Sequence, residues 1–181
     1  MKNIMIILSL FTSFMYSPGC MGQDNRNQIN MDSIKSQSLC ILDETDEMTV
    51  YLTYLVRIVE KAGDEKKSYA GGDEIFLRYE TWTIPKKGNR YIQDRAILHS
   101  TPERIATVNG GSYDTAAFYL LPEDRVYYEN GKPKEHAGLS DEWTYAGLAS
   151  DNGIYTQIDN YFHQNKAKTP VIQENIKKGR L

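Results

Sequence analysis

The chain has 181 residues and a formal net charge of −3 at pH 7, from 21 Lys and Arg against 24 Asp and Glu. This small acidic balance argues against nucleic acid as a partner, because nucleic acid demands a basic face, and against an electrostatic hold on anionic lipid. The length suits one domain with a sizeable core rather than two.

The amino terminus predicts a secretion signal over residues 1–22. Lys2 supplies the short positive region, and residues 4–16 (IMIILSLFTSFMY) form an apolar run without a charge. A helix needs about 20 residues to span a bilayer, so this run has the length of a signal-peptide core instead. We therefore expect export from the cytoplasm.

Two cleavage sites remain open. A signal peptidase that selects small residues would cut after Gly22. Alternatively, residues 17–20 (SPGC) resemble a bacterial lipobox, in which Cys20 would become the lipidated first residue, although Ser17 and Pro18 depart from its usual choices. The protein is then either periplasmic, a membrane-anchored lipoprotein or extracellular, and Cys20 is its candidate lipidation site and its only expected link to a membrane.

Composition divides the exported part into three segments. Residues 23–38 are polar and rich in Asn, Gln and Ser, which predicts a flexible tether. Residues 39–165 hold the periodic patterns and predict a single globular domain. Residues 166–181 are charged and predict a frayed tail. Cys40 lies in an apolar run, where a free cysteine usually serves as a small buried hydrophobe.

The first periodic segment favours a helix over residues 44–62. Met48, Leu52, Leu55 and Val59 follow the spacing of one helix face. Four acidic residues crowd the expected first turn, where they complement the helix dipole. The many β-branched residues of the segment favour a strand instead. Periodicity and capping together predict the helix.

The middle of the chain predicts strands and turns. Residues 74–84 and 91–99 form a predicted hairpin. Thr101-Pro102-Glu103 predicts a short helix that ends at residues 109–111, with proline at its first position, and residues 113–121 fit either a helix or a strand.

Two further turn signals follow. Asn130-Gly131 is a strong hairpin signal, because both residues accept positive φ. Residues 151–153 predict a second hairpin between strands at 143–149 and 154–158. Together these elements predict a single α+β domain, with the N-terminal helix packed on an antiparallel sheet.

No motif nominates a catalytic site. The three histidines, His99, His136 and His163, lie far apart and do not have metal-ligand spacing, so we expect no metal and no cofactor. The glycine pairs at 71–72 and 110–111 follow polar stretches rather than a strand that leads into a helix, which predicts turns and not phosphate loops.

Aromatic residues are the unusual feature. Near the 151–153 turn, Trp143, Tyr145 and Tyr155 are candidate partner-binding residues, because Trp and Tyr offer large rigid surfaces with a hydrogen-bonding group. The alternative is that they fill the core, as most aromatic residues do.

These observations favour an exported bacterial envelope protein that binds a protein or glycan partner without catalysis, such as an inhibitor, an immunity-like protein or a surface ligand binder. A small envelope hydrolase with an unrecognised active site and a structural envelope component are the alternatives.

Overall fold

The computed structural model describes residues 29–59, 75–151, 153–174 and 176. The predicted signal segment and Cys20 lie outside these residues. The described chain is mostly β-sheet with two short α-helices, which is compatible with the predicted α+β class. Its elements are α1 (Met31–Gln37), β1 (Cys40–Glu44), β2 (Met48–Val59), β3 (Ile75–Pro85), β4 (Arg90–Ala106), β5 (Ser112–Glu129), β6 (Lys132–His136), β7 (Thr144–Leu148), a 3₁₀ turn (Ala149–Asp151), α2 (Ile154–Asn165) and β8 (Val171–Gln173).

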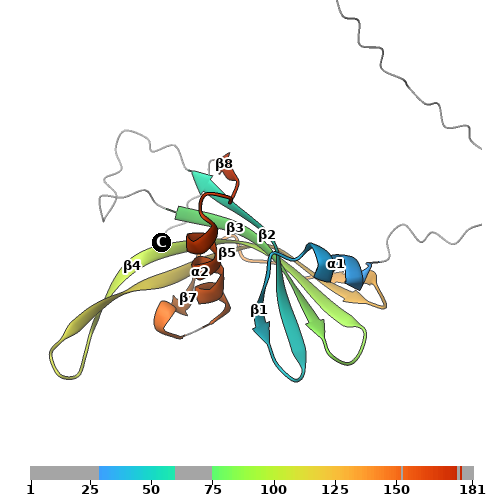
Figure 1. Cartoon of the computed structure of the whole chain (residues 1–181), viewed down its shortest axis with the longest axis horizontal. Helices are drawn as coiled ribbons and strands as arrows, with labels where there is room; N and C mark the ends of the chain where they lie inside the picture. Colours follow the sequence, from blue (N-terminus) through green and yellow to red (C-terminus); the bar gives the residue numbers. More distant parts are fainter. Residues whose placement is uncertain (1–28, 60–74, 152, 175, 177–181) are drawn as a thin grey trace, which may run out of the picture.

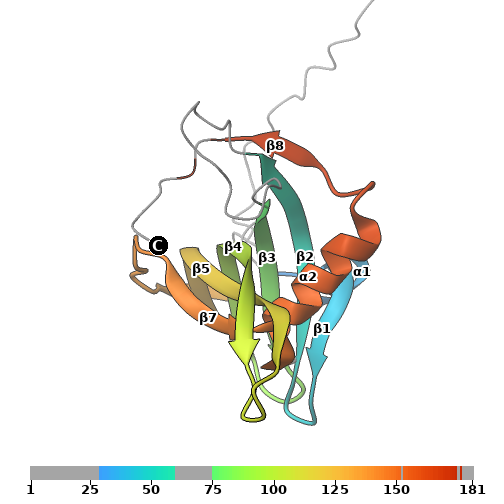
Figure 2. The same cartoon turned by 90° about the vertical axis from the view of Figure 1, so that its left-hand side faces the viewer.

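The strands form one sheet of 8 strands, in which β1 to β6 lie side by side in chain order. Each of these pairs with its neighbour in antiparallel fashion, β7 pairs with β5, and β8 pairs with β2 in parallel. The sheet is bent, and α2 lies within the bend between the long β4–β5 arm and the β1–β2 hairpin (Figure 1). Figure 2 shows α2 crossing in front of the sheet, with β8 at one end of it.

Each face of the sheet carries a hydrophobic cluster. On the face toward α2, which we call the inner face, Ile158 and Phe162 of α2 join Leu52, Leu77 and other strand residues in one cluster. On the opposite, outer face a smaller cluster comprises Ile58, Phe76, Ile97, Trp143 and Ile176. Burial of these apolar side chains is the main force that holds the bent sheet together.

Two β-bulges determine which side chains reach each face. In β2 the pairing with β3 shifts between Leu52 and Tyr54, so Thr53 is an extra residue. In β5 the pairing with β4 passes from Pro122 to Asp124, so Glu123 is an extra residue. An extra residue reverses the alternation of the strand beyond it. As a result, Leu52 and Leu55 lie in the same cluster although they are three residues apart.

The predicted helix over residues 44–62 is wrong, because residues 48–59 form strand β2. The bulge at Thr53 is the physical reason: it places buried residues three apart, at Leu52 and Leu55, as a helix face would. The β-branched residues of the segment indicated the correct structure. The N-terminal helix among the described residues is the short α1, which precedes β1, and α2, late in the chain, is the helix that packs on the inner cluster.

The predicted hairpin of residues 74–84 and 91–99 is confirmed as β3 and β4. The Asn130-Gly131 turn is also confirmed, between β5 and β6, with φ of 54° and 73°. The short helix predicted from Thr101 is wrong, because residues 101–106 continue β4 and pair with β5. Residues 109–111 instead lie in the β4–β5 turn, where Gly110 has a φ of 76°.

The hairpin predicted around residues 151–153 is wrong, because its expected second strand, residues 154–158, is helical. Residues 144–148 form β7, but residues 154–165 form α2, because Ile154, Ile158 and Phe162 recur every four residues. The Asp151 carboxylate accepts a hydrogen bond from the Leu148 N–H at 3.2 Å, which supports a helical turn after β7 rather than a hairpin turn.

The segments predicted as tether and tail contribute structure. Residues 31–37 of the expected tether form α1, with Asn30 as its N-cap. Residues 171–173 of the expected tail form β8, and Ile176 is buried in the outer cluster. Cys40 is partly buried beside the inner cluster, and this burial raises the pKa of its thiol. In the described part of the chain, neither α-helix is long and apolar enough to cross a membrane.

Candidate functional site

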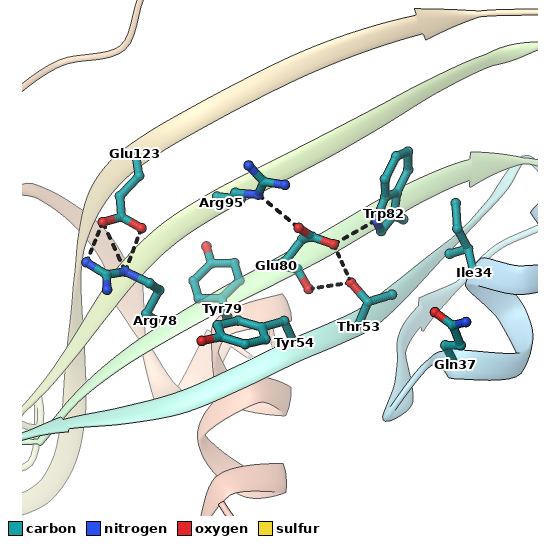
Figure 3. Close-up of a pocket in the computed structure, with 10 residues that line it drawn as sticks. All are labelled: Ile34, Gln37, Thr53, Tyr54, Arg78, Tyr79, Glu80, Trp82, Arg95 and Glu123. Atoms are coloured by element: carbon teal, nitrogen blue, oxygen red, sulfur yellow. Dashed lines mark hydrogen bonds and ion pairs between the residues drawn. The ribbon is translucent and has the colours of Figure 1, made fainter. Parts of the chain in front are cut away.

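A hollow of about 480 Å³ opens on the outer face of the sheet, between the strands and α1 (Figure 3). Strands β2 to β5 form its floor, and Ile34 and Gln37 of α1 stand at one end. We call it the outer hollow. The strand residues that line it are Thr53, Tyr54, Arg78, Tyr79, Glu80, Trp82, Arg95 and Glu123.

The Glu80 carboxylate lies at the centre of the floor and accepts hydrogen bonds from four side chains. Thr53 Oγ1 lies 2.9 Å and Trp82 Nε1 lies 3.0 Å from Glu80 Oε1. Gln93 Nε2 and Arg95 Nε donate to Glu80 Oε2 at 2.8 and 2.9 Å. These bonds connect three neighbouring strands through one side chain.

The pKa of Glu80 is lowered. Burial is the largest single influence and raises it, but the hydrogen bonds, that from Arg95 first, together outweigh burial. Glu80 is therefore an ionised acceptor at neutral pH, with its lone pairs already engaged. A general acid needs the opposite, a carboxyl group whose pKa is raised toward neutrality.

Both bulges supply polar side chains to this site. Thr53, the extra residue of β2, donates to Glu80, and Glu123, the extra residue of β5, binds Arg78. β-Bulges commonly redirect side chains at functional sites. The convergence of two bulges on one hollow is the strongest structural indication that this region is a site.

Arg78 connects the floor to the end of the chain. Its guanidinium donates to Glu123 Oε1 from Nη2 at 2.7 Å and to Glu174 Oε1 from Nη2 at 3.0 Å. The hydrogen bond with Glu174 is the first cause that raises the pKa of Arg78. Glu174 follows β8, so this ion pair fastens the carboxy-terminal segment beside the hollow.

An exposed aromatic side chain borders these fixed charges. Tyr54 is 46% exposed, whereas Trp82 is 7% exposed and turns its indole N–H toward Glu80. The Trp82 ring also contacts that of Tyr128 at a centroid distance of 5.2 Å, and the Tyr128 hydroxyl donates to Gln93 Oε1 at 2.9 Å. Trp82 and Gln93 are thereby held in place, and Tyr54 is left as an open aromatic surface.

The three predicted binding residues do not form one surface. Trp143 is 8% exposed and belongs to the outer cluster, where its ring lies 5.8 Å from that of Phe76. Tyr155 is partly buried against the inner cluster, at the start of α2. Tyr145 is 59% exposed on β7 and makes an edge contact with Tyr119.

Sequence reasoning missed the residues of the outer hollow. A signal was present: Arg78 and Glu80 are charged residues in the middle of an apolar strand (EIFLRYETWTI), on the same side as Trp82. Charged residues rarely occupy such positions unless they are paired. The partners Arg95 and Glu123 lie on other strands, and only the pairing register identifies them.

Comparisons with protein-family models, with curated proteins and with solved structures found no match to this chain. The geometry of the site is therefore the guide to its function. Within the described residues, no three His, Cys, Asp or Glu side chains group as ligands of a metal ion.

The lowered pKa of Glu80 predicts an acid-sensitive contribution to stability. This contribution is complete above the ordinary glutamate pKa of about 4.3 and is lost as the pH falls through the lower pKa of the folded state. Glu80→Gln should cost about 1–3 kcal/mol at pH 7, because it removes charge-assisted hydrogen bonds. The cost should shrink toward pH 3 in urea titrations. The exposed Glu103→Gln is the control; a cost for Glu80→Gln that does not vary with pH contradicts the prediction.

The burial of Trp143 predicts that Trp143→Ala lowers the free energy of unfolding by about 3–5 kcal/mol, because truncation leaves a cavity in the outer cluster. Tyr145→Ala, two residues further along in β7, should lose less than about 1.5 kcal/mol, the size of one aromatic contact. Circular dichroism is the suitable probe, since the variant removes a fluorescent tryptophan. If the Trp143 variant and the wild type are equally stable, the buried role of Trp143 is contradicted and its role as a surface residue is supported.

Proposed function

We propose that this chain is an exported bacterial envelope protein that works by non-catalytic binding, with a glycan held in the outer hollow. The observation that carries the proposal is the floor of the hollow: polar side chains locked in ion pairs, beside the exposed ring of Tyr54. Binding sites need such preorganised groups, because ordering flexible side chains on binding costs affinity.

The chemistry of the floor favours a neutral, hydroxyl-rich ligand. Arg78 and Arg95 balance Glu80 and Glu123, so the floor offers donors and acceptors without a large excess of either charge. Sugar hydroxyls both donate and accept, and the apolar face of a sugar ring can lie on an aromatic side chain such as Tyr54. A strongly charged ligand would be repelled by the floor residues that carry the same sign of charge.

The hydrolase alternative has less support. A glycosidase needs two carboxyl groups beside one bond, one of them protonated at working pH. In the outer hollow the pKa of Glu80 is lowered, and Glu123 is engaged by Arg78 through both of its oxygens. Neither is set up as a proton donor. A purely structural role would not require two bulges to gather polar side chains at one hollow.

A protein partner is the second candidate. Tyr145 is 59% exposed, and Tyr113 and Val108 of the β4–β5 arm are 47% and 104% exposed. Exposed tyrosines are typical of protein interfaces. An inhibitor or immunity-like protein would use this surface rather than the outer hollow, and the experiment below separates the two.

Export is tested through Cys20. If the lipobox resemblance is functional, Cys20→Ser should move the protein from the membrane fraction to the soluble fraction of bacteria that express it. The intact mass of the wild type decides the route: acyl chains on Cys20 mean lipidation, and a start at Gln23 means cleavage after Gly22. A mature protein that retains Met1 contradicts export by either route.

Glycan binding is tested with the purified exported form on an array of bacterial envelope oligosaccharides, followed by calorimetry with those that bind. Tyr54→Ala should weaken the affinity at least tenfold, the loss typical of a central aromatic contact. Tyr54 is 46% exposed, so the variant should keep its fold.

Tyr145→Ala is the matched control, a tyrosine of similar exposure outside the hollow, and it should bind as the wild type does. Absence of any bound glycan, or equal affinities of the wild type and Tyr54→Ala, contradicts the proposal. The alternative outcome concerns an envelope protein that the wild type captures. If Tyr145→Ala weakens the affinity for that protein and Tyr54→Ala does not, the protein partner is supported instead.

A further inference from the structure

The tip of the β4–β5 arm, residues 101–116, extends beyond the rest of the sheet (Figure 1). The pairing of β3 with β4 ends at Ser100, and the pairing of β7 with β5 ends at Ala117. Within the described residues, 101–106 and 112–116 therefore pair only with each other. No residue of the tip is buried. A two-stranded ribbon of this kind is only marginally stable in water, and a third strand would stabilise it.

The backbone groups of β5 alternate between its two edges. The Ala117 carbonyl oxygen faces β4, where it accepts a hydrogen bond from Thr101 Oγ1 at 3.4 Å. The Leu120 carbonyl oxygen faces β7 and accepts a hydrogen bond from Thr144 Oγ1 at 3.3 Å. Odd-numbered residues in this part of β5 therefore bond toward β4, and even-numbered residues bond toward the other edge.

That other edge is open where β7 stops. The register between β4 and β5 does not shift from Ser112 to Leu120, so the N–H and C=O groups of Ser112 and Asp114 face the same edge as those of Leu120. In the part of the chain that the structure describes, no strand pairs with this edge before Ala117. We call residues 112–115 the open edge.

Two other edges carry the usual obstacles to strand addition. Pro102 of β4 faces away from β5, because the neighbouring Thr101 is the residue that pairs with Ala117, and proline has no N–H to donate there. Residues 132–134 of β6 (KPK) combine proline with two lysines. The open edge (SYDT) contains neither proline nor lysine. Its backbone groups are therefore available to an extended peptide.

The side chains beside the open edge indicate which peptide would fit. Tyr113 is 47% exposed and, by alternation, shares a face with Tyr119, whose ring lies 5.8 Å from that of Tyr145. Tyr145 is 59% exposed. Asp114 is exposed on the opposite face. Successive residues of an added strand would meet an aromatic surface and a negative charge in turn, which favours apolar residues that alternate with basic ones.

A second copy of this chain fits the open edge less well. In a symmetric pair of open edges, Asp114 would lie opposite residues of the same short stretch, which contains no basic residue. The nearby cation Arg104 already donates from Nε to Ser112 Oγ at 3.0 Å. Charge complementarity therefore favours a different protein as the partner.

We propose that the open edge binds an extended segment of a partner protein as an added strand, with apolar side chains on Tyr113 and Tyr145 and a basic side chain opposite Asp114. Main-chain hydrogen bonds supply the affinity in this mode of recognition, and the alternate side chains supply the specificity. The surface is separate from the outer hollow and does not depend on glycan binding there.

The test uses a phage library of random peptides of about twelve residues, selected on the purified exported form. Selected peptides should alternate apolar and basic residues. Bound peptide should slow amide hydrogen exchange at Ser112 and Asp114 about tenfold, measured by NMR, and should change exchange less at Tyr113, whose N–H faces β4.

Backbone methylation of a selected peptide tests the strand geometry directly. One version carries N-methyl groups on its odd residues and the other on its even residues. Their affinities should differ about tenfold or more, because only one version loses the N–H groups that face β5. Equal affinities would contradict strand addition.

Two substitutions at one position test the edge of the protein. Asp114→Pro removes the N–H that faces the open edge, leaves the bonds to β4 in place and should abolish peptide binding, with the melting temperature checked in parallel. Asp114→Asn is the matched control, which loses the same charge but keeps the N–H, and it should bind about tenfold more tightly than Asp114→Pro. Tyr54→Ala in the outer hollow should change nothing.

Three results overturn the proposal. The first is a failure to select any peptide. The second is equal binding of the selected peptides to Asp114→Pro and Asp114→Asn. The third is a wild-type dimer in analytical ultracentrifugation that Asp114→Pro converts to a monomer, because the open edge then pairs with a second copy of the chain.

Discussion

Much of the outer face depends on one carboxylate. Glu80 accepts hydrogen bonds from side chains of β2, β3 and β4, so it joins three strands on the outer face. A buried ionised group is tolerated only when its lone pairs are engaged, and here the surrounding strands supply every donor. The donors are in turn held by Tyr128 and Asp124, so the arrangement is rigid before any ligand arrives.

A second hollow, of about 370 Å³, is lined by the same strands, β2 to β5, and Tyr79 and Arg95 line both hollows. Charged side chains line both hollows. Arg78, Glu80 and Glu123 belong to the outer hollow, and Asp94, Asp124 and Arg125 belong to the second. Arg95 connects the two sets, because it pairs with both Glu80 and Asp124.

Local patterns predicted the β3–β4 hairpin and the Asn130-Gly131 turn, because each depends on residues close in sequence. The helix over residues 44–62 was mispredicted because the bulge at Thr53 imitates helical spacing, and a bulge has no simple sequence signature. The outer hollow was beyond sequence reasoning for a related reason. Glu80 and Glu123 meet their partners only through a register that two bulges define.

Strand β8, near the end of the described chain, pairs with β2, near its beginning. β8 pairs with residues 57–59 of β2 in parallel. The antiparallel pairs that lie between β2 and β8 in the sequence join strands that are neighbours or, for β5 and β7, next neighbours along the chain. Contacts between distant residues form late, because the loop they close must first lose entropy. If the chain crosses a membrane amino terminus first, β3, β4 and β5 can assemble on the far side while β8 is still in transit. The outer cluster would then be completed by Ile176 only after β8 had crossed.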